Sequence, residues 1–86
     1  MNNITKYNWK LNILGNILKS HRIKLGWSLS QTSNQLMLIS IDIPRSSIQK
    51  IEIGDRVIKD YELVGFSKIF KISPNVLLAN FLKELE

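Results

Sequence analysis

The chain contains no cysteine, and this absence limits the ways in which it can be stabilised. Neither a disulfide nor a thiolate-bound metal can hold the backbone together. A chain of 86 residues lies near the lower end of the lengths that bury a self-sufficient apolar core. The sequence therefore predicts one domain held by apolar packing, helped by self-association, with neither a metal nor a cofactor.

Apolar residues recur at helical spacing in five segments that glycine and proline separate. The helices are expected over residues 11–25, 29–37, 45–53, 60–71 and 74–85. Gly26 ends the first, and Ser28 with Gln31 three residues later has the spacing of a capping box for the second. Pro44 suits the start of the third. The pattern predicts an all-α fold, with residues 38–43 as an extended turn.

Positive charge is concentrated in the first two thirds of the chain. Residues 1–58 carry eight lysines or arginines and three acidic residues, whereas residues 59–86 carry four of each. The whole net charge of +5 therefore lies in the part that holds the second and third predicted helices. This asymmetry favours an anionic polymer as partner. On charge alone, a basic protein that is merely soluble remains the alternative.

The third predicted helix carries polar residues at its N-terminal end: Arg45, Ser46, Gln49 and Lys50. An α-helix fits the major groove of B-DNA, and side chains from its first turns reach base edges. Arginine and lysine suit guanine, whereas serine and glutamine can serve several bases. An ordinary solvated helix face explains the same pattern equally well.

Three stretches, ILGNILKSHRIKLGWS, PRSSIQKIEIGDR and KDYELVGFSKIFKISPNVLL, lie between Ile13 and Leu78. Together they resemble the phage Cro/repressor (XRE-like) helix-turn-helix family. The residues that match the family pattern are Arg22, Gly26, Trp27, Ser28, Ile48, Ile51, Glu52 and Gly54. The resemblance implies a compact five-helix, lambda-repressor-like DNA-binding domain over residues 13–78. Residues 1–12 would be an N-terminal arm or helix extension, and 79–86 a C-terminal helix extension.

The same resemblance implies roles for individual residues. Base contacts would come from Arg45, Ser46, Lys50 and Gln49. Phosphate contacts would come from Ser28, Ser47, Arg56 and Lys59. An ion pair between Arg22 and Glu52 would brace the first helix against the third. Two departures from the pattern are Leu29, where the family usually has glutamine, and a longer turn between the second and third helices, which is compatible with residues 41–43 folding back as a hydrophobic wedge.

Other residues that could act in catalysis or ligand binding are expected to have structural roles. His21, the single histidine, has no clustered ligand and is expected to be a partly buried helix residue. Trp9 and Trp27 are expected to pack, and the acidic residues Asp42, Asp55, Asp60 and Glu62 to serve turns or caps. No nucleophile motif, phosphate loop or metal signature is present. We therefore expect no enzyme.

The last predicted helix carries an apolar stripe: Leu77, Leu78, Phe81, Leu82 and Leu85. The first two would close the core, and the last three, Phe81, Leu82 and Leu85, would form a dimer interface. The alternative is that the stripe folds back, within one monomer, over Ile4, Tyr7 and Trp9.

These features predict a DNA-binding transcriptional regulator, a repressor that binds double-stranded DNA as a homodimer. The absence of an apolar run of about 18 residues and of a signal-peptide pattern places it in the cytoplasm, without a membrane partner. The alternative is a protein-interaction module with a helix-turn-helix fold, such as an antitoxin or regulatory partner, with weak or no DNA binding.

Overall fold

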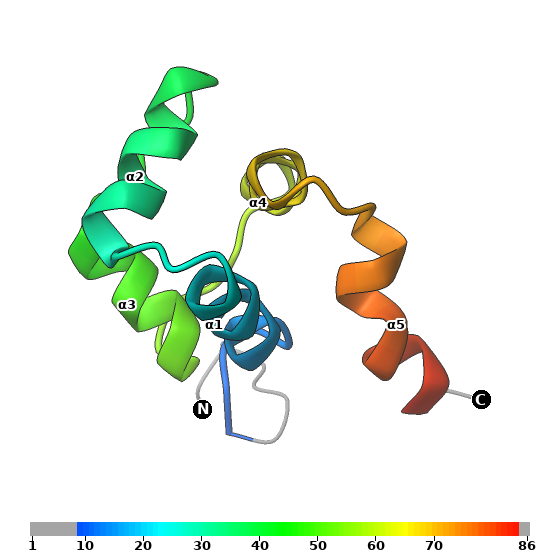
Figure 1. The fold of residues 1–86 in the computed structure, drawn as a ribbon. Coiled ribbons are helices and arrows are strands. Elements are labelled where there is room, and N and C mark those ends of the chain that lie inside the picture. The colour runs from blue at the N-terminus through cyan, green and yellow to red at the C-terminus, as the bar shows by residue number, and fades with distance from the viewer. Residues whose placement is uncertain (1–8, 85–86) are drawn as a thin grey trace.

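The computed structural model describes residues 9–84, and helices are the regular elements of this part of the chain (Figure 1). They are α1 (Gly15–Lys24), α2 (Leu29–Leu38), α3 (Arg45–Ile53), α4 (Asp60–Phe70) and α5 (Pro74–Glu84). Within residues 9–84 there is no β-strand. The expected all-α fold of five short helices is confirmed.

The helices are arranged with α2 and α3 on one side of the molecule and α5 on the other (Figure 1). α3 packs against both α1 and α2, whereas α5 packs against α4. α1 and α4, which also touch each other, lie between these two sides. The exposed face of α3 and the C-terminal helix are therefore separated by the body of the domain.

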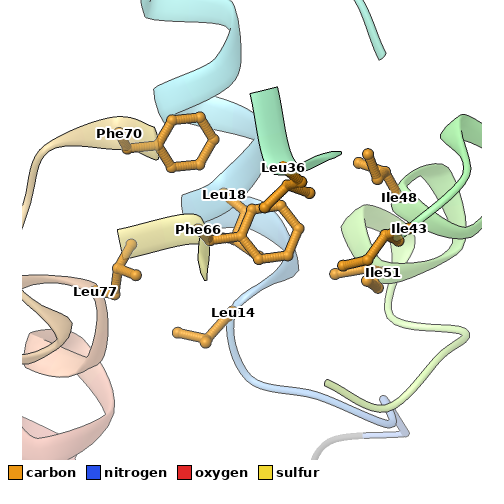
Figure 2. Close-up of a cluster of buried hydrophobic side chains, with 9 residues drawn as sticks. All are labelled: Leu14, Leu18, Leu36, Ile43, Ile48, Ile51, Phe66, Phe70 and Leu77. Atoms are coloured by element: carbon orange, nitrogen blue, oxygen red, sulfur yellow. The ribbon is translucent and has the colours of Figure 1, made fainter. Parts of the chain in front are cut away.

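Among residues 9–84, nine buried apolar side chains form the core (Figure 2). They come from all five helices, the residue before α1 and the turn before α3: Leu14, Leu18, Leu36, Ile43, Ile48, Ile51, Phe66, Phe70 and Leu77. Ile43 is fully buried, so the turn between α2 and α3 does fold back into the core. Ser33 fixes this turn by donating its hydroxyl to the carbonyl oxygen of Ile43 at 2.6 Å.

α1 begins at Gly15, not at Leu11 as the apolar spacing predicted. The side-chain oxygen of Asn12 accepts the backbone N–H groups of Leu14 and Gly15, each at 2.8 Å. The backbone N–H of Leu11 donates to the carbonyl oxygen of Gly54 at 2.8 Å. Residues 11–14 therefore hydrogen-bond to the Asn12 side chain and to backbone carbonyls distant in the sequence instead of continuing the helix. Leu25, expected on the apolar face of this helix, lies beyond its end and is exposed.

The first four helices end in the same hydrogen-bonded turn, the Schellman motif. One residue after the end of α3 and α4, and two residues after the end of α1 and α2, a residue has a left-handed backbone, and it and its successor donate to carbonyls of the last helical turn. In α1 and α3 this residue is a glycine, Gly26 and Gly54, which adopts such a backbone without steric cost. In α2 and α4 it is Ser40 and Lys71, with φ of 66° and 58°. Hence only two of the four ends carry the glycine that marks a helix terminus in a sequence.

The aromatic residues divide between packing and exposure. Trp27 is half-buried, with its ring 5.9 Å from that of Phe70, and the half-buried His21 stacks on Phe70 at 5.8 Å. Trp9, by contrast, is 89% exposed, so the expectation that it packs is wrong. Trp9 lies six residues before α1 begins, outside the helices that bury the core.

The longest helices within residues 9–84 span eleven residues, and none is long and apolar enough to cross a membrane.

Candidate nucleic-acid interface

α3 is defined at both ends by local sequence. Pro44, in an extended conformation, precedes the first residue, and Gly54, with φ of 85°, follows the last. Ile48 and Ile51 point into the core and are fully buried. One apolar face of the helix therefore packs into the core, and the opposite side is exposed to solvent.

The residues expected to contact bases lie on the solvent side of α3, from its first turn to its last. The four expected base-contacting residues are all exposed: Arg45, Ser46, Gln49 and Lys50. Within residues 9–84, the Arg45 guanidinium and the Lys50 ammonium make neither an ion pair nor a side-chain hydrogen bond. Their donor groups are thus unoccupied on the exposed side of α3.

Negative charge is sparse beside these residues. Along the chain, the acidic residues nearest to the exposed face of α3 are Asp42, before the helix, and Asp55, after it. Glu52, which belongs to α3, is buried and paired with Arg22. The exposed part of α3 therefore carries positive and neutral polar groups without an acidic residue of its own.

The start of α2 carries the expected capping box. The Ser28 hydroxyl oxygen accepts the backbone N–H of Gln31 at 3.0 Å, and the Gln31 side-chain oxygen accepts the backbone N–H of Ser28 at 2.7 Å. Ser28 is exposed and its own O–H remains able to donate. Leu29, at the first position of the helix, is half-buried and packs against the core. A leucine at this position thus serves packing, where glutamine would offer a polar group.

The other expected phosphate-contacting residues have different environments. Ser47 is half-buried on α3, and Lys59 is exposed immediately before α4, with its Nζ 5.9 Å from the centre of the Tyr61 ring. Lys59 is at the opposite end of α3 along the chain from Arg45. The structure therefore gathers the base-contacting set on one helix, from Arg45 in its first turn to Lys50 in its last, but spreads the phosphate-contacting set over three elements.

Arg56 is half-buried and paired with Glu62. Its Nη1 and Nη2 donate to the two carboxylate oxygens of Glu62 at 2.9 and 3.0 Å, and Nη1 also donates to the carbonyl oxygen of Val57 at 3.1 Å. The Glu62 side chain is 2% exposed and also accepts the backbone N–H of Lys59 at 2.9 Å. Both terminal nitrogens of Arg56 therefore bind within the protein, which makes it a poor candidate for a phosphate contact.

The surroundings of Glu62 favour its charged form. Burial alone raises the pKa of this carboxyl, but the hydrogen bonds from Arg56 and from the Lys59 backbone N–H, together with the positive charges of Arg56 and Lys59, outweigh burial and hold the pKa below its usual value. The hydrogen bond from Glu62 correspondingly raises the pKa of the Arg56 guanidinium. Glu62 is therefore more than the cap residue expected from the sequence, since it also anchors the turn that follows α3.

Arg22 and Glu52 form the ion pair implied by the sequence resemblance. The side chains are 13% and 6% exposed, and the nearest nitrogen–oxygen distance is 2.7 Å. The hydrogen bond to Glu52 raises the pKa of the Arg22 guanidinium, against a smaller lowering by burial. The pair joins α1 to α3 beside the core.

A second anchor at the end of α3 was not expected from the sequence. The side-chain nitrogen of Asn12 donates to the carbonyl oxygens of Ile51 at 2.9 Å and Arg56 at 2.8 Å. Gly15 lies against the same end, where an added Cβ would come within 2.5 Å of the carbonyl oxygens of Ile51 and Glu52. Asparagine before a helix signals a cap, but no local pattern indicates that its amide group reaches a helix about forty residues away.

The C-terminal stripe is divided between core and surface. Leu77 is fully buried and Leu78 packs against the core, whereas Phe81 is half-buried and Leu82 is 50% exposed. Leu85 lies outside the described residues, as do Ile4 and Tyr7. The exposure of Trp9 removes it as a surface onto which the stripe folds within the monomer.

No group of three or more His, Cys, Asp or Glu residues placed to hold a metal ion occurs among residues 9–84. Comparison of the chain with models of protein families, with characterised proteins and with solved structures gives no match.

Proposed function

We propose that this protein is a sequence-specific, double-stranded-DNA-binding transcriptional regulator that inserts α3 into the major groove. The observation that carries the proposal is the exposed polar side of α3, on which the two cationic groups are unpaired: Arg45, Ser46, Gln49 and Lys50. A helix of this width fits the groove, and residues of its first turns reach base edges. The burial of Ile48 and Ile51 supports the proposal because it keeps that side in a defined orientation.

Phosphate binding is proposed for the start of α2, for one residue of α3 and for one residue directly before α4. The first N–H groups of α2 lie at a helix N-terminus, which favours anions, and Ser28 stands beside them. Ser47 and Lys59 complete the proposed set. The net charge of +5 adds a sequence-independent attraction to the duplex.

We further propose that the protein acts as a homodimer in the cytoplasm, represses transcription by occupying a short palindromic site, and needs neither a catalytic activity nor a cofactor. The exposed Leu82, with Phe81 and the undescribed Leu85, would form the contact between two copies. Two-fold symmetry would place the two copies of α3 in successive major grooves, roughly 34 Å apart. Sedimentation of the wild-type protein tests this assembly directly.

The second candidate function is that of a protein-interaction module. Two observations favour it: Leu29 packs inward where a polar side chain would contact phosphate, and several apolar side chains at the end of α2 are exposed, namely Met37, Leu38 and Ile39. Such a module would bind a partner protein through apolar surface and would bind DNA weakly or not at all.

Selection from random duplexes, followed by a salt titration, separates the two candidates. For the regulator, a consensus site emerges, and log affinity falls with log salt by about 0.9 for each phosphate neutralised. For the interaction module, no duplex is bound even at 50 mM salt, where non-specific electrostatic binding is strong.

A further inference from the structure

The segment before α1 binds the C-terminal end of α3 through three neighbouring residues. Each of them donates a hydrogen bond to a carbonyl oxygen at this end. The bonds run from Lys10 Nζ to Ile53 at 3.2 Å, from the Leu11 backbone N–H to Gly54 at 2.8 Å and from Asn12 Nδ2 to Ile51 at 2.9 Å. The end of α3 distant from Arg45 is thus fixed to a segment far away in sequence.

Asn12 is the centre of this contact because it uses all its hydrogen-bonding groups. Its nitrogen donates twice, to the carbonyl oxygens of Ile51 and Arg56, and its oxygen accepts twice, from the N–H groups of Leu14 and Gly15. An asparagine amide offers two donor hydrogens and two acceptor lone pairs. One side chain therefore joins the start of α1, the end of α3 and the turn that follows α3.

We infer that Asn12 is a positioning residue that sets the orientation of α3 relative to α1, and through it the sequence specificity of DNA binding. This inference rests on the proposed function. Asn12 itself lies at the end of α3 opposite Arg45 and acts only through the helix. Asn12 fixes the angle between α3 and α1, whereas Ile48 and Ile51 provide most of the attachment of α3 to the core.

A small tilt of α3 at its Ile51 end moves its Arg45 end far enough to change contacts with DNA bases. α3 has nine residues, and at 1.5 Å per residue it is about 13 Å long. A rotation of about 5° at the Ile51 end displaces the Arg45 end by roughly 1 Å, which exceeds the tolerance of about 0.5 Å for a preorganised binding site. The close backbone contact at Gly15 gives α3 little room to move toward α1, so loss of the amide contact favours tilting away.

The decisive variant is Asn12→Ser. A serine hydroxyl still accepts hydrogen bonds from N–H groups at the start of a helix, but it cannot bridge the carbonyls of Ile51 and Arg56. The matched control is Asn16→Ser, which makes the same change at an exposed position in the first turn of α1. Both proteins are tested as full chains, at a temperature at which unfolding measurements show them folded.

The first measurement is the affinity for the duplex selected by the wild type, divided by that for random duplexes. For Asn12→Ser we expect this specificity ratio to fall at least tenfold, and for Asn16→Ser to stay within twofold of the wild type. Simple destabilisation lowers both affinities by the same factor, because it only reduces the folded fraction. A ratio equal to that of the control overturns the inference.

The second measurement is the angle between α1 and α3 in the free protein, from residual dipolar couplings of backbone N–H groups. We expect a change in Asn12→Ser and none in Asn16→Ser; a lower specificity ratio without a change in angle overturns the positioning role. If the wild type selects no duplex, the proposed function fails and the angle alone decides the role of Asn12. If Asn12→Ser does not fold, the test is made on the wild type, by measuring scalar couplings across the hydrogen bonds from the Asn12 amide to Ile51 and Arg56. The absence of these couplings overturns the positioning role.

Discussion

Arg22 donates from Nε and Nη2 to the two carboxylate oxygens of Glu52, at 2.7 and 3.0 Å. Its remaining nitrogen, Nη1, donates to the carbonyl oxygen of Trp27 at 2.9 Å. One side chain therefore links α1 both to α3 and to the turn that leads into α2. The planar arrangement of the guanidinium donors permits this, since two of them match a carboxylate while a third reaches the backbone.

Replacement of Arg22 by alanine should destabilise the protein strongly. The change leaves the nearly buried Glu52 carboxylate without its counter-charge, and breaking such a pair costs about 3 kcal/mol of unfolding free energy, or more. Chemical denaturation at neutral pH measures the loss. The exposed Lys24, in the same helix, provides the control, and Lys24→Ala should change stability by less than about 0.5 kcal/mol. Equal effects of the two substitutions would contradict a stabilising role for the pair.

The pair of Arg56 and Glu62 should make stability depend on pH in the acid range. The pKa of Glu62 is lower in the folded protein than its usual value of 4.5, so the unfolded chain binds the proton more readily. The stabilisation is therefore complete above about pH 4.5 and is lost as the pH falls through the lower, folded-state pKa. Urea unfolding between pH 7 and pH 2.5 measures this loss.

Glu62→Gln should remove this component of the acid dependence and also lower stability at neutral pH, because the Arg56 guanidinium loses its partner. Asp55→Asn, which removes a negative charge from an exposed position, serves as the control and should leave most of the acid dependence in place. If the wild type and Glu62→Gln lose stability in parallel from pH 7 to pH 2.5, Glu62 is not the responsible group.

Gly15→Ala should be more destabilising than Gly26→Ala. An added Cβ at Gly15 would meet two backbone carbonyl oxygens of α3 at 2.5 Å, so α1 and α3 would have to separate. Overpacking of this kind costs about 3 kcal/mol. At Gly26 the added Cβ meets nothing within 4 Å, and its cost, about 1 kcal/mol, arises from the left-handed backbone. Thermal unfolding of both variants gives the order, and the reverse order would argue against the close contact of α1 with α3.

Ser40→Gly should stabilise the protein by about 0.5 to 1 kcal/mol. Ser40 has a left-handed backbone at the end of α2, which is unfavourable for a residue with a Cβ, and the relief exceeds the greater entropy of glycine in the unfolded chain. Ser30→Gly, at an exposed position inside the same helix, should have the opposite sign. Denaturant midpoints of the two variants measure both effects, and destabilisation by Ser40→Gly would refute the argument from backbone strain.

Arg45→Ala should weaken binding to the selected duplex far more than binding to random duplexes. A bidentate contact with guanine is worth about 1–3 kcal/mol of discrimination, so we expect about a tenfold loss on the selected site. Lys83→Ala removes the same charge from α5, on the other side of the molecule (Figure 1), and should lower both affinities slightly and equally. Equal losses for Arg45→Ala on both kinds of duplex would exclude Arg45 as a base-reading residue.

The boundaries of α2 and α3 could be predicted because their signals are local. Ser28 and Gln31 form their capping box within three residues, and Pro44 and Gly54 act on the helix directly beside them. The same periodicity that buries Ile48 and Ile51 turns Arg45 outward, so the composition of the exposed helix end was also predictable.

The start of α1 and the environment of Arg56 could not be predicted, because both depend on partners distant in sequence or across a turn. Asn12 binds carbonyls 39 and 44 residues away, and its neighbour Leu11 binds Gly54, so the apolar spacing before Gly15 was misleading. The family resemblance implies a phosphate contact for Arg56, yet the buried carboxylate of Glu62, six residues later, forms an ion pair with it.

The sequence by itself determined the number of helices, the faces that they bury and the polar end of α3, since these follow from spacing along a regular helix and from capping within a few residues. Only the tertiary structure decided where α1 begins, which arginines are free to meet a ligand and how the far end of α3 is held. Those features depend on hydrogen bonds and ion pairs whose partners are brought together by folding, and such contacts leave no periodic trace in the chain.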